Sequence, residues 1–220
     1  PLYSSAASDV YKRQDEVRPG QSDAPVTVRI FGEANANAAM PSSAANNLSS
    51  RSRTTATVTW AIPTTPTVHA LLMSPDISPI VAEIISMSGW SSGNNMAILI
   101  EHVSGSGVRW TESYYINSEL ATMTGGNGAT PALIAFAPPP PPPPMMTFGV
   151  TGRANSGEQS VSSGAMYLTS SDLELCHDGS QQIVGIVFPS VTLSASHASY
   201  LSGCHLVFDV DEVRSTSSQP

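Results

Sequence analysis

The strongest constraint on this chain is a repeated junction on either side of a proline run. Residues 211–214, Asp-Glu-Val-Arg, repeat residues 15–18, and the seven prolines from Pro138 to Pro144 lie between the two copies. A module repeated in tandem gives this pattern when the chain begins in the middle of one copy. The sequence therefore predicts two halves of one β-rich module in swapped order, a later half at 15–137 and an earlier half at 149–220. Such an organisation is typical of a link in a larger chain rather than of an enzyme.

The composition favours a globular, secreted β-protein. The chain has 220 residues, of which 40% are hydrophobic, so it can bury a core and is not intrinsically disordered. The formal net charge is −8, and the chain has a single lysine, Lys12, near its start. An acidic chain that is almost free of lysine lacks the clustered cations that bind the phosphates of nucleic acids. No apolar run reaches the length of a membrane span. Residues 1–14 share no pattern with the rest, and we expect either a translated adapter or assembly scar or a disordered tail, in a fragment of a longer reading frame.

Hydrophobic periodicity predicts mostly strands and one helix. Apolar residues recur at helical spacing from Ile77 to Ile85, with Asp76 as a cap before them and Gly89 as a stop after them. An Asn/Ala/Ser loop is expected at 34–53. Alternating or continuous apolar patterns predict strands in both halves, at 26–31, 54–60, 96–103, 108–115, 131–136, 146–150, 164–169, 172–176, 181–188 and 204–210. The expected fold class is all-β, an antiparallel β-sandwich of jelly-roll type with one short helix, split into two half-modules by a polyproline II linker at 138–148.

Several segments resemble a β-sandwich module that is repeated in large secreted and surface proteins, similar to the DNRLRE-type, carbohydrate-binding-module-like jelly roll. Four segments resemble the C-terminal half of this module: Pro75–Ile85, Gly89–Asn94, Met96–Leu99 and Glu112–Tyr114. Three segments resemble the N-terminal half of the module: Gly164–Leu175, Ile183–Phe188 and His205–Glu212. The resemblance implies a sandwich fold and an adhesive, glycan-binding or architectural role. In such modules the strand like 205–210 leads into the strand like 26–31, so we expect these two strands to be neighbours in one sheet.

The motifs that could carry chemistry favour a protein that is not an enzyme. Gly89–Gly93 fits G-x-S-x-G, but the helix precedes it and the strand follows it, whereas a nucleophile elbow needs the opposite order. The acid pairs Asp172/Glu174 and Asp209/Asp211 each place two carboxylates on one face of a strand. They could bind Ca²⁺ with backbone oxygens, but a solvated outer face is the favoured interpretation, and no cofactor is expected.

Aromatic and cysteine residues leave two further alternatives. Trp60, Trp90 and Trp110 could stack on sugar rings, although tryptophan usually lies in the core of a sandwich with so few aromatic residues. Cys176 and Cys204 could form a disulfide in an oxidising compartment, or they could be two small buried hydrophobic residues. A histidine follows each cysteine directly, but adjacent strand residues point to opposite faces, so no shared metal is expected.

Two kinds of glycosylation are expected. Asn47 opens the one N-glycosylation sequon, Asn-Leu-Ser, in a polar loop; an unmodified loop is the alternative. The seven prolines would form a polyproline II rod of roughly 22 Å. This rod resembles those of hydroxyproline-rich glycoproteins, which implies hydroxylation and O-linked sugar on Pro138, Pro139, Pro140, Pro141, Pro142, Pro143 and Pro144; a plain spacer is the other interpretation.

The swapped halves lead to the functional hypothesis. A half-module of this size is marginal alone, so it must be completed by its own chain or by another. A stiff rod between the halves favours completion of a neighbour, which repeats head to tail into a linear or helical polymer of identical subunits. We therefore expect a structural subunit of an extracellular, glycosylated fibre. The alternative is a non-enzymatic carbohydrate-binding or adhesive module of a larger secreted protein.

Overall fold

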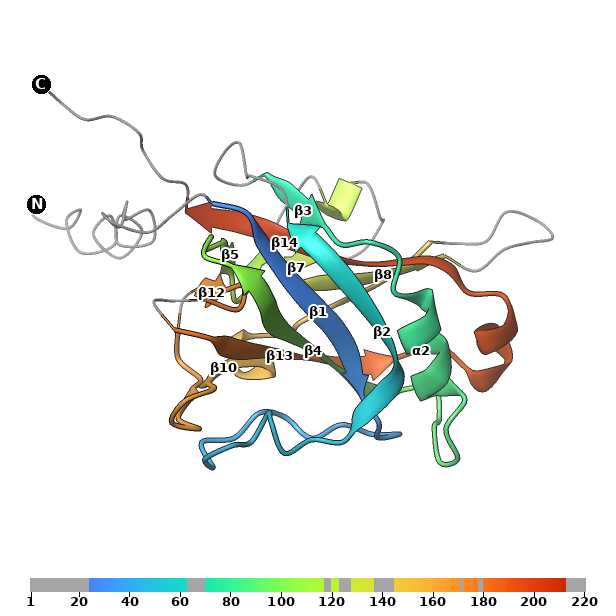
Figure 1. The fold of residues 1–220 in the computed structure, drawn as a ribbon. Helices are drawn as coiled ribbons and strands as arrows, with labels where there is room; N and C mark the ends of the chain where they lie inside the picture. Colours follow the sequence, from blue (N-terminus) through green and yellow to red (C-terminus); the bar gives the residue numbers. More distant parts are fainter. Residues whose placement is uncertain are drawn as a thin grey trace, which may run out of the picture.

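The chain forms a single β-sandwich. The computed structural model describes residues 24–62, 70–116, 120–122, 128–136, 145–170, 172–177 and 180–212. Within this part, two antiparallel sheets of six strands each pack face to face, and the helices are few and short (Figure 1). The predicted β-sandwich class is therefore confirmed. The proline run and the first copy of the repeated junction lie outside the described residues.

The first sheet joins strands from both halves of the chain. Its order is β11 (Met166–Tyr167), β10 (Ser156–Ser160), β13 (Gln182–Val191), β4 (Asn94–Gly105), β1 (Val26–Glu33) and β2 (Arg53–Ile62). Every pair in this path is antiparallel. The alternation of apolar and polar residues explains why this segment forms strand β1. Its alternate residues Val26, Val28 and Ile30 are all buried in the core between the sheets.

The second sheet also mixes the halves. Its order is β12 (Asp172–Glu174), β5 (Trp110–Glu112), β14 (Ser202–Glu212), β8 (Ala132–Phe136) and β9 (Met146–Gly149), and β3 (Leu71–Met73) pairs with β14. A separate two-stranded ladder joins β6 (Tyr115–Ile116) to β7 (Ala129–Thr130), and two 3-10 turns, η1 (Arg153–Asn155) and η2 (Ala195–Ser199), complete the described elements.

The two predicted half-modules complete each other within this one chain. Ile100 of β4 is the register partner of Ile30 on β1 and of Val184 on β13, so the first sheet is continuous across the two halves. In the second sheet β14 pairs only with strands of the first half, namely β3, β5 and β8. The hydrophobic core is correspondingly shared.

The expectation that 26–31 and 205–210 are neighbours in one sheet is wrong. β1 lies in the first sheet and β14 in the second. The two sheets meet in the core instead, where Trp60 of β2, the neighbour of β1, stacks on Phe208 of β14 with ring centroids 6.2 Å apart.

The helix α2 (Ser78–Ile85) confirms the predicted helix and closes one end of the core (Figure 1). Its apolar face, which includes Ile80 and Ile84, is fully buried. The carboxylate of Asp76 accepts hydrogen bonds from the backbone N–H of Ser78 (2.8 Å) and from that of Cys204 (2.9 Å). The N-cap position is Ile77, one residue later than predicted, and no side chain caps it. Asp76 instead ties the start of the helix to β14.

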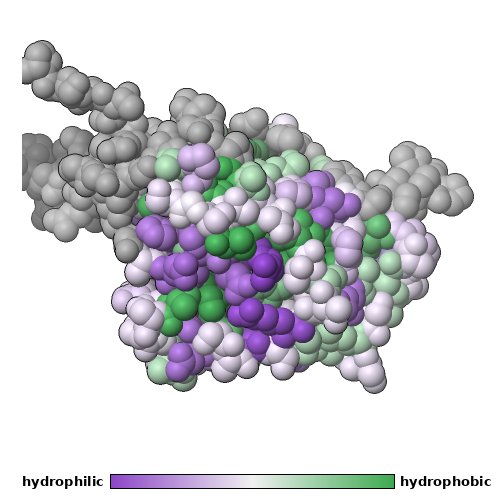
Figure 2. All heavy atoms as spheres, viewed as in Figure 1, coloured by the Kyte–Doolittle hydropathy of each residue, from purple (hydrophilic) through white to green (hydrophobic). Residues whose placement is uncertain are grey.

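A long loop covers the outer face of the first sheet, and we call residues 34–52 the outer strap. Leu48 of the strap is buried against Phe31, Leu99 and Ile183, three side chains on the outer side of the sheet. Figure 2 shows the same side of the molecule, where hydrophobic residues appear in small groups between hydrophilic ones. The outer strap thus shields apolar side chains of β1, β4 and β13 from water.

Candidate functional site

The most distinctive site is a polar cavity of about 410 Å³ between the edges of the two sheets. One wall comes from β10, β11 and the start of β13 in the first sheet, and the other comes from β12 and the chain before it in the second. The lining residues are polar or aromatic: Glu158, Ser160, Tyr167, Thr169, Ser170, Glu174, Ser180 and Gln182. We call this site the acidic cavity.

Strand β10 directs one carboxylic acid into this cavity. Both faces of β10 are buried, and successive side chains point in opposite directions. Gln159 points outward, where its Oε1 accepts hydrogen bonds from the backbone N–H groups of Leu48 and Ser49. Glu158 points inward, and its Oε1 accepts a hydrogen bond of 2.7 Å from the backbone N–H of Glu174. Glu158 therefore joins the edges of the two sheets.

The side chains of Glu158 and Glu174 interact, and this interaction affects the pKa of Glu158. Burial raises the pKa of Glu158 well above its ordinary value, and the hydrogen bond and repulsion between its side chain and Glu174 raise it further. The backbone N–H of Glu174 lowers this pKa, and the charge of Asp172 raises it, but the raising effects prevail. Glu158 therefore keeps its proton to a higher pH than an exposed glutamate does.

Two other lining residues complete the chemistry of the acidic cavity. Gln182 is only 6% exposed, and no donor among the described residues reaches its Oε1. A buried amide oxygen without a donor costs free energy unless a ligand or water satisfies it. Tyr167 is 51% exposed and offers a ring beside the carboxyl groups. Together they make a site rich in acceptors beside an accessible aromatic ring.

The favoured interpretation of the acid pairs as a solvated face is wrong. Asp172 and Glu174 are 2% and 5% exposed, and Asp209 is fully buried. Asp172 accepts a hydrogen bond of 2.9 Å from Ser170 Oγ and is the cross-strand partner of Glu112, another buried acid. Leu173 of β12 faces the core, and the backbone N–H of Glu174 donates to Glu158 on β10, a strand that local sequence did not identify.

The described residues do not favour the Ca²⁺ alternative. No group of three or more His, Cys, Asp or Glu side chains within them is placed to hold a metal ion. The three acids near the cavity instead interact with one another and with backbone or hydroxyl donors.

All three tryptophans are buried, as the core interpretation predicts. Trp60, Trp90 and Trp110 are 4%, 8% and 6% exposed, respectively. The indole N–H of Trp90 donates to the carbonyl of Leu193 at 2.8 Å, which fixes the residue in the core. None of the three can serve as an exposed sugar platform, so Tyr167 is the aromatic residue beside the cavity.

Cys176 and Cys204 are both buried, and no disulfide joins them. Trp110 is the register partner of both Glu174 and Glu212, whereas Cys204 lies eight residues before Glu212 on β14. At about 3.3 Å per residue, this separates the two cysteines by more than 20 Å along the sheet. A disulfide needs Cα atoms within about 7 Å. The predicted disulfide is therefore incompatible with this fold, and burial raises the pKa of the Cys176 thiol well above its ordinary value.

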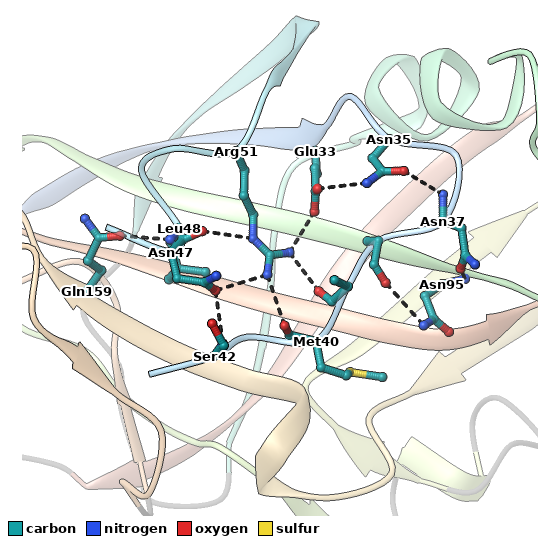
Figure 3. Close-up of polar contacts among 12 residues, drawn as sticks. Glu33, Asn35, Asn37, Met40, Ser42, Asn47, Leu48, Arg51, Asn95 and Gln159 are labelled. Carbon is teal, nitrogen blue, oxygen red and sulfur yellow. Dashed lines mark hydrogen bonds and ion pairs between the residues drawn. The ribbon is translucent and has the colours of Figure 1, made fainter. Parts of the chain in front are cut away.

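The sequon residue Asn47 belongs to a polar network that fastens the outer strap (Figure 3). Its Oδ1 accepts hydrogen bonds from the backbone N–H of Ser42 (3.0 Å) and from Arg51 Nη2 (3.2 Å). Arg51 Nη1 also forms a 2.7 Å ion pair with Glu33, and both of these side chains are largely buried. Gln159 Nε2 donates to the hydroxyl of Ser49, the third residue of the sequon. The sequon is therefore an ordered part of the strap, and its glycosylation remains a prediction.

The predicted sites in the proline run lie outside the described residues, so their hydroxylation and sugar also remain predictions. Gly89–Gly93 lies between α2 and β4, the order that the sequence predicts. None of the helices in the described part of the chain has the length and apolar character needed to cross a membrane.

Comparisons with protein-family models, with curated proteins and with solved structures find no match to this chain. The functional argument therefore rests on the acidic cavity and on the arrangement of the two halves.

Proposed function

We propose that the chain is a non-enzymatic carbohydrate-binding module of jelly-roll type in a secreted or cell-surface protein, and that the acidic cavity binds the sugar. The observation that carries this proposal is the cavity itself, whose lining combines the carboxyl groups of Glu158 and Glu174 with hydroxyl groups and the half-exposed ring of Tyr167. Its volume of about 410 Å³ lies within the range of about 300–1,000 Å³ that is typical of small-molecule sites.

The chemistry of the lining fits a sugar. Carboxyl and hydroxyl side chains line the cavity and can exchange hydrogen bonds with a ligand that presents several polar groups, as the hydroxyl groups of a sugar do. The apolar face of a sugar ring can pack on the ring of Tyr167 while its hydroxyl groups reach the carboxyl pair.

The direct interaction between the two acids argues for binding rather than for glycoside hydrolysis. A hydrolase places its two carboxyl groups about 5–5.5 Å apart to form a covalent intermediate, or about 6.5–9.5 Å apart to admit water. Glu158 and Glu174 are hydrogen-bonded to each other, which leaves no room for a glycosidic bond between them. We therefore propose a site that holds its ligand without cleaving it.

A structural subunit of an extracellular, glycosylated fibre is our second proposal. The observation that favours it is that β14 and β13 pair extensively with strands of the first half, across the proline-rich connection. If two chains exchanged their second halves, the same strand pairs would form between identical subunits, and open-ended exchange would build a polymer. The closed sandwich does not need such exchange to bury its core, so we rank this proposal second.

The carbohydrate proposal is tested by binding of neutral and charged oligosaccharides, measured by calorimetry. Replacement of Tyr167 by Ala should weaken binding about tenfold, the upper range for an aromatic contact. Tyr200 is 46% exposed on the turn after η2 and does not line the cavity, so Tyr200→Ala is the matched control. Absence of binding to every glycan, or equal effects of the two substitutions, would contradict the proposal. Light scattering on the same samples tests the fibre proposal, which requires polymers that grow with protein concentration.

A further inference from the structure

We propose that this chain forms a dimer through strand β2, whose free edge pairs with the β2 edge of a second copy of the chain. The two copies would pair antiparallel about a two-fold axis and join their first sheets into one continuous sheet. The contact would lie at the opposite end of the first sheet from the acidic cavity (Figure 1).

Strand β2 is long for a strand at the end of a sheet. It has ten residues, and within the described part of the chain β1 is the only strand that pairs with it. The other strands at the ends of the two sheet paths are β11, β12 and β9, of two, three and four residues. Backbone N–H and C=O groups of an end strand remain unpaired on its outer edge, and short end strands are one way in which proteins limit unwanted pairing. This molecule limits it at three ends and not at β2.

The features that block the edge of β2 are confined to its beginning. The carboxylate of Glu83, on α2, accepts hydrogen bonds from the backbone N–H groups of Thr55 (2.8 Å) and Ala56 (2.7 Å). A shift in the register with β1 falls opposite the same part of the strand. From there to Ile62 the strand has no proline and no charged residue, two residue types that commonly protect an edge. Residues 57–61 are therefore the part of β2 that is suited to pair with another strand.

A second copy fits this stretch because each side of the strand complements itself. Thr57, Thr59 and Ala61 are exposed on the outer side of the sheet, whereas Val58, on the core side, is only partly buried. Cross-strand partners lie on the same face of a sheet. Antiparallel pairing centred on Thr59 would place this residue against its own copy and Thr57 against the partner's Ala61. The same pairing would cover the exposed part of Val58.

The charges around β2 also allow two copies to approach. The formal net charge of −8 makes identical surfaces of this chain repel each other in general. On the outer side of the first sheet, Arg29 and Arg53 form ion pairs with Glu101 at 3.4 Å and 3.0 Å. Beside them, residues 54–62 are uncharged. Two copies that meet at β2 would therefore bring neutral residues together rather than acidic ones.

The dimer would hold its two acidic cavities far apart. Strand β10, which forms part of the cavity wall, is four strand intervals from β2 in the first sheet. Nine intervals of about 4.8 Å, or roughly 43 Å, would separate the two copies of β10. If the cavity binds sugar as proposed, the dimer would be bivalent and would bind a polysaccharide more tightly than one copy does.

The dimer is tested on the full chain without any sugar. One pair of short strands buries less surface than a standard interface, so we expect a Kd on the order of 100 μM. Sedimentation velocity should show conversion of monomer to dimer, and to nothing larger, as the protein concentration rises through this value. Hydrogen exchange at residues 57–61 should become slower over the same range, because backbone N–H groups there become paired.

A lysine at the centre of the contact should weaken the dimer. Thr59→Lys should raise the Kd about fivefold or more, because two ammonium groups would then face each other across the two-fold axis. Arg29, the register partner of Thr59 on β1, would add to this repulsion. The substitution makes the chain less negative, so general repulsion between copies cannot explain a weaker dimer. Thr192→Lys makes the same change at an exposed threonine that follows β13, and it should not weaken the dimer.

Four outcomes would overturn the inference. These are a chain that stays monomeric well above the expected Kd, an equal Kd for the parent and Thr59→Lys, equal weakening by Thr192→Lys, and growth beyond the dimer. Thermal denaturation checks that both variants fold; if Thr59→Lys does not, concentration-dependent protection of 57–61 in the parent chain still decides. None of these measurements uses a ligand, so failure of the dimer leaves the carbohydrate proposal untouched, and failure of sugar binding leaves the dimer untouched.

Discussion

Ala135 of β8 and Met146 of β9 are cross-strand partners in one antiparallel hairpin. The chain therefore enters and leaves its proline-rich segment at neighbouring positions of the same sheet. Since β4 and β13 also pair across the two halves, the segment connects parts of one domain rather than two separate domains. The free energy that holds the halves together comes from the shared core and from the strand pairs, not from the connection.

The first prediction is that the halves stay together when the connection is cut. A protease site placed within 138–144 and cleaved should give two pieces that elute as a one-to-one complex, because β13 and β14 remain paired with the first half. The isolated piece ending at Ala137 should aggregate, since it exposes the edge of β4 and the core. Size-exclusion chromatography with light scattering measures both results. Separation of the pieces in native buffer would contradict the shared-core arrangement.

Much of the fold could be predicted from local periodicity. β1, β2, β4, β8, β13, β14 and α2 coincide with predicted segments because each buries apolar side chains at a regular interval. After Gly105 the chain leads from β4 in the first sheet to β5 in the second. Local patterns carry no information on which sheet a strand joins. The expected pairing of β1 with β14 came from the strand order of the resembled modules, and that order does not describe this fold.

The candidate site was harder to predict. The sequence identified the spacing of Asp172 and Glu174 but not their burial, and it gave no sign of Glu158. The strand that buries them, β10, has the sequence Ser-Gly-Glu-Gln-Ser and lacks apolar periodicity. Its polar side chains are stabilised by long-range partners in the outer strap and in β12. Only its position between turn residues and before the apolar strand β13 could have indicated a strand.

The second prediction concerns the ion pair that anchors the outer strap. Arg51→Met should reduce the free energy of unfolding by about 3 kcal/mol, because it leaves the buried carboxylate of Glu33 without its cation. Hydrogen exchange at residues 42–49 should become faster. The double variant Arg51→Met, Glu33→Gln should recover part of the loss, since no buried charge is then unpaired. Chemical denaturation measures the energies, and purely additive losses would argue against the coupling.

The third prediction concerns Asp76, which ties α2 to β14. Burial raises the pKa of Asp76, but hydrogen bonds from Ser78, Gly203 and Cys204 outweigh burial and lower it below its ordinary value of 3.8. Asp76→Asn should cost about 1 kcal/mol, as for the loss of a helix cap. Because the folded-state pKa is lowered, the parent chain has this stability above pH 3.8 and loses it as the pH falls further. Denaturation curves at several pH values should show the two proteins converging in acid; a constant difference would exclude the ionised carboxylate as the cause.

The last prediction follows from the raised pKa of Glu158. Burial and the neighbouring Glu174 favour the protonated form in the folded state, so the stability of the parent chain is fully present below pH 4.5 and decreases as the pH rises through the folded-state pKa. Glu158→Gln cannot ionise, and its amide can still accept from the backbone N–H of Glu174 and donate to the carboxylate. The variant should therefore match the parent in acid and become progressively more stable than the parent as the pH rises above 4.5. Glu83→Gln, which changes a carboxylate with no such neighbour on α2, provides the control in the same thermal and chemical denaturation series. A difference between Glu158→Gln and the parent that stays constant with pH would show that Glu158 does not hold the proton of the pair.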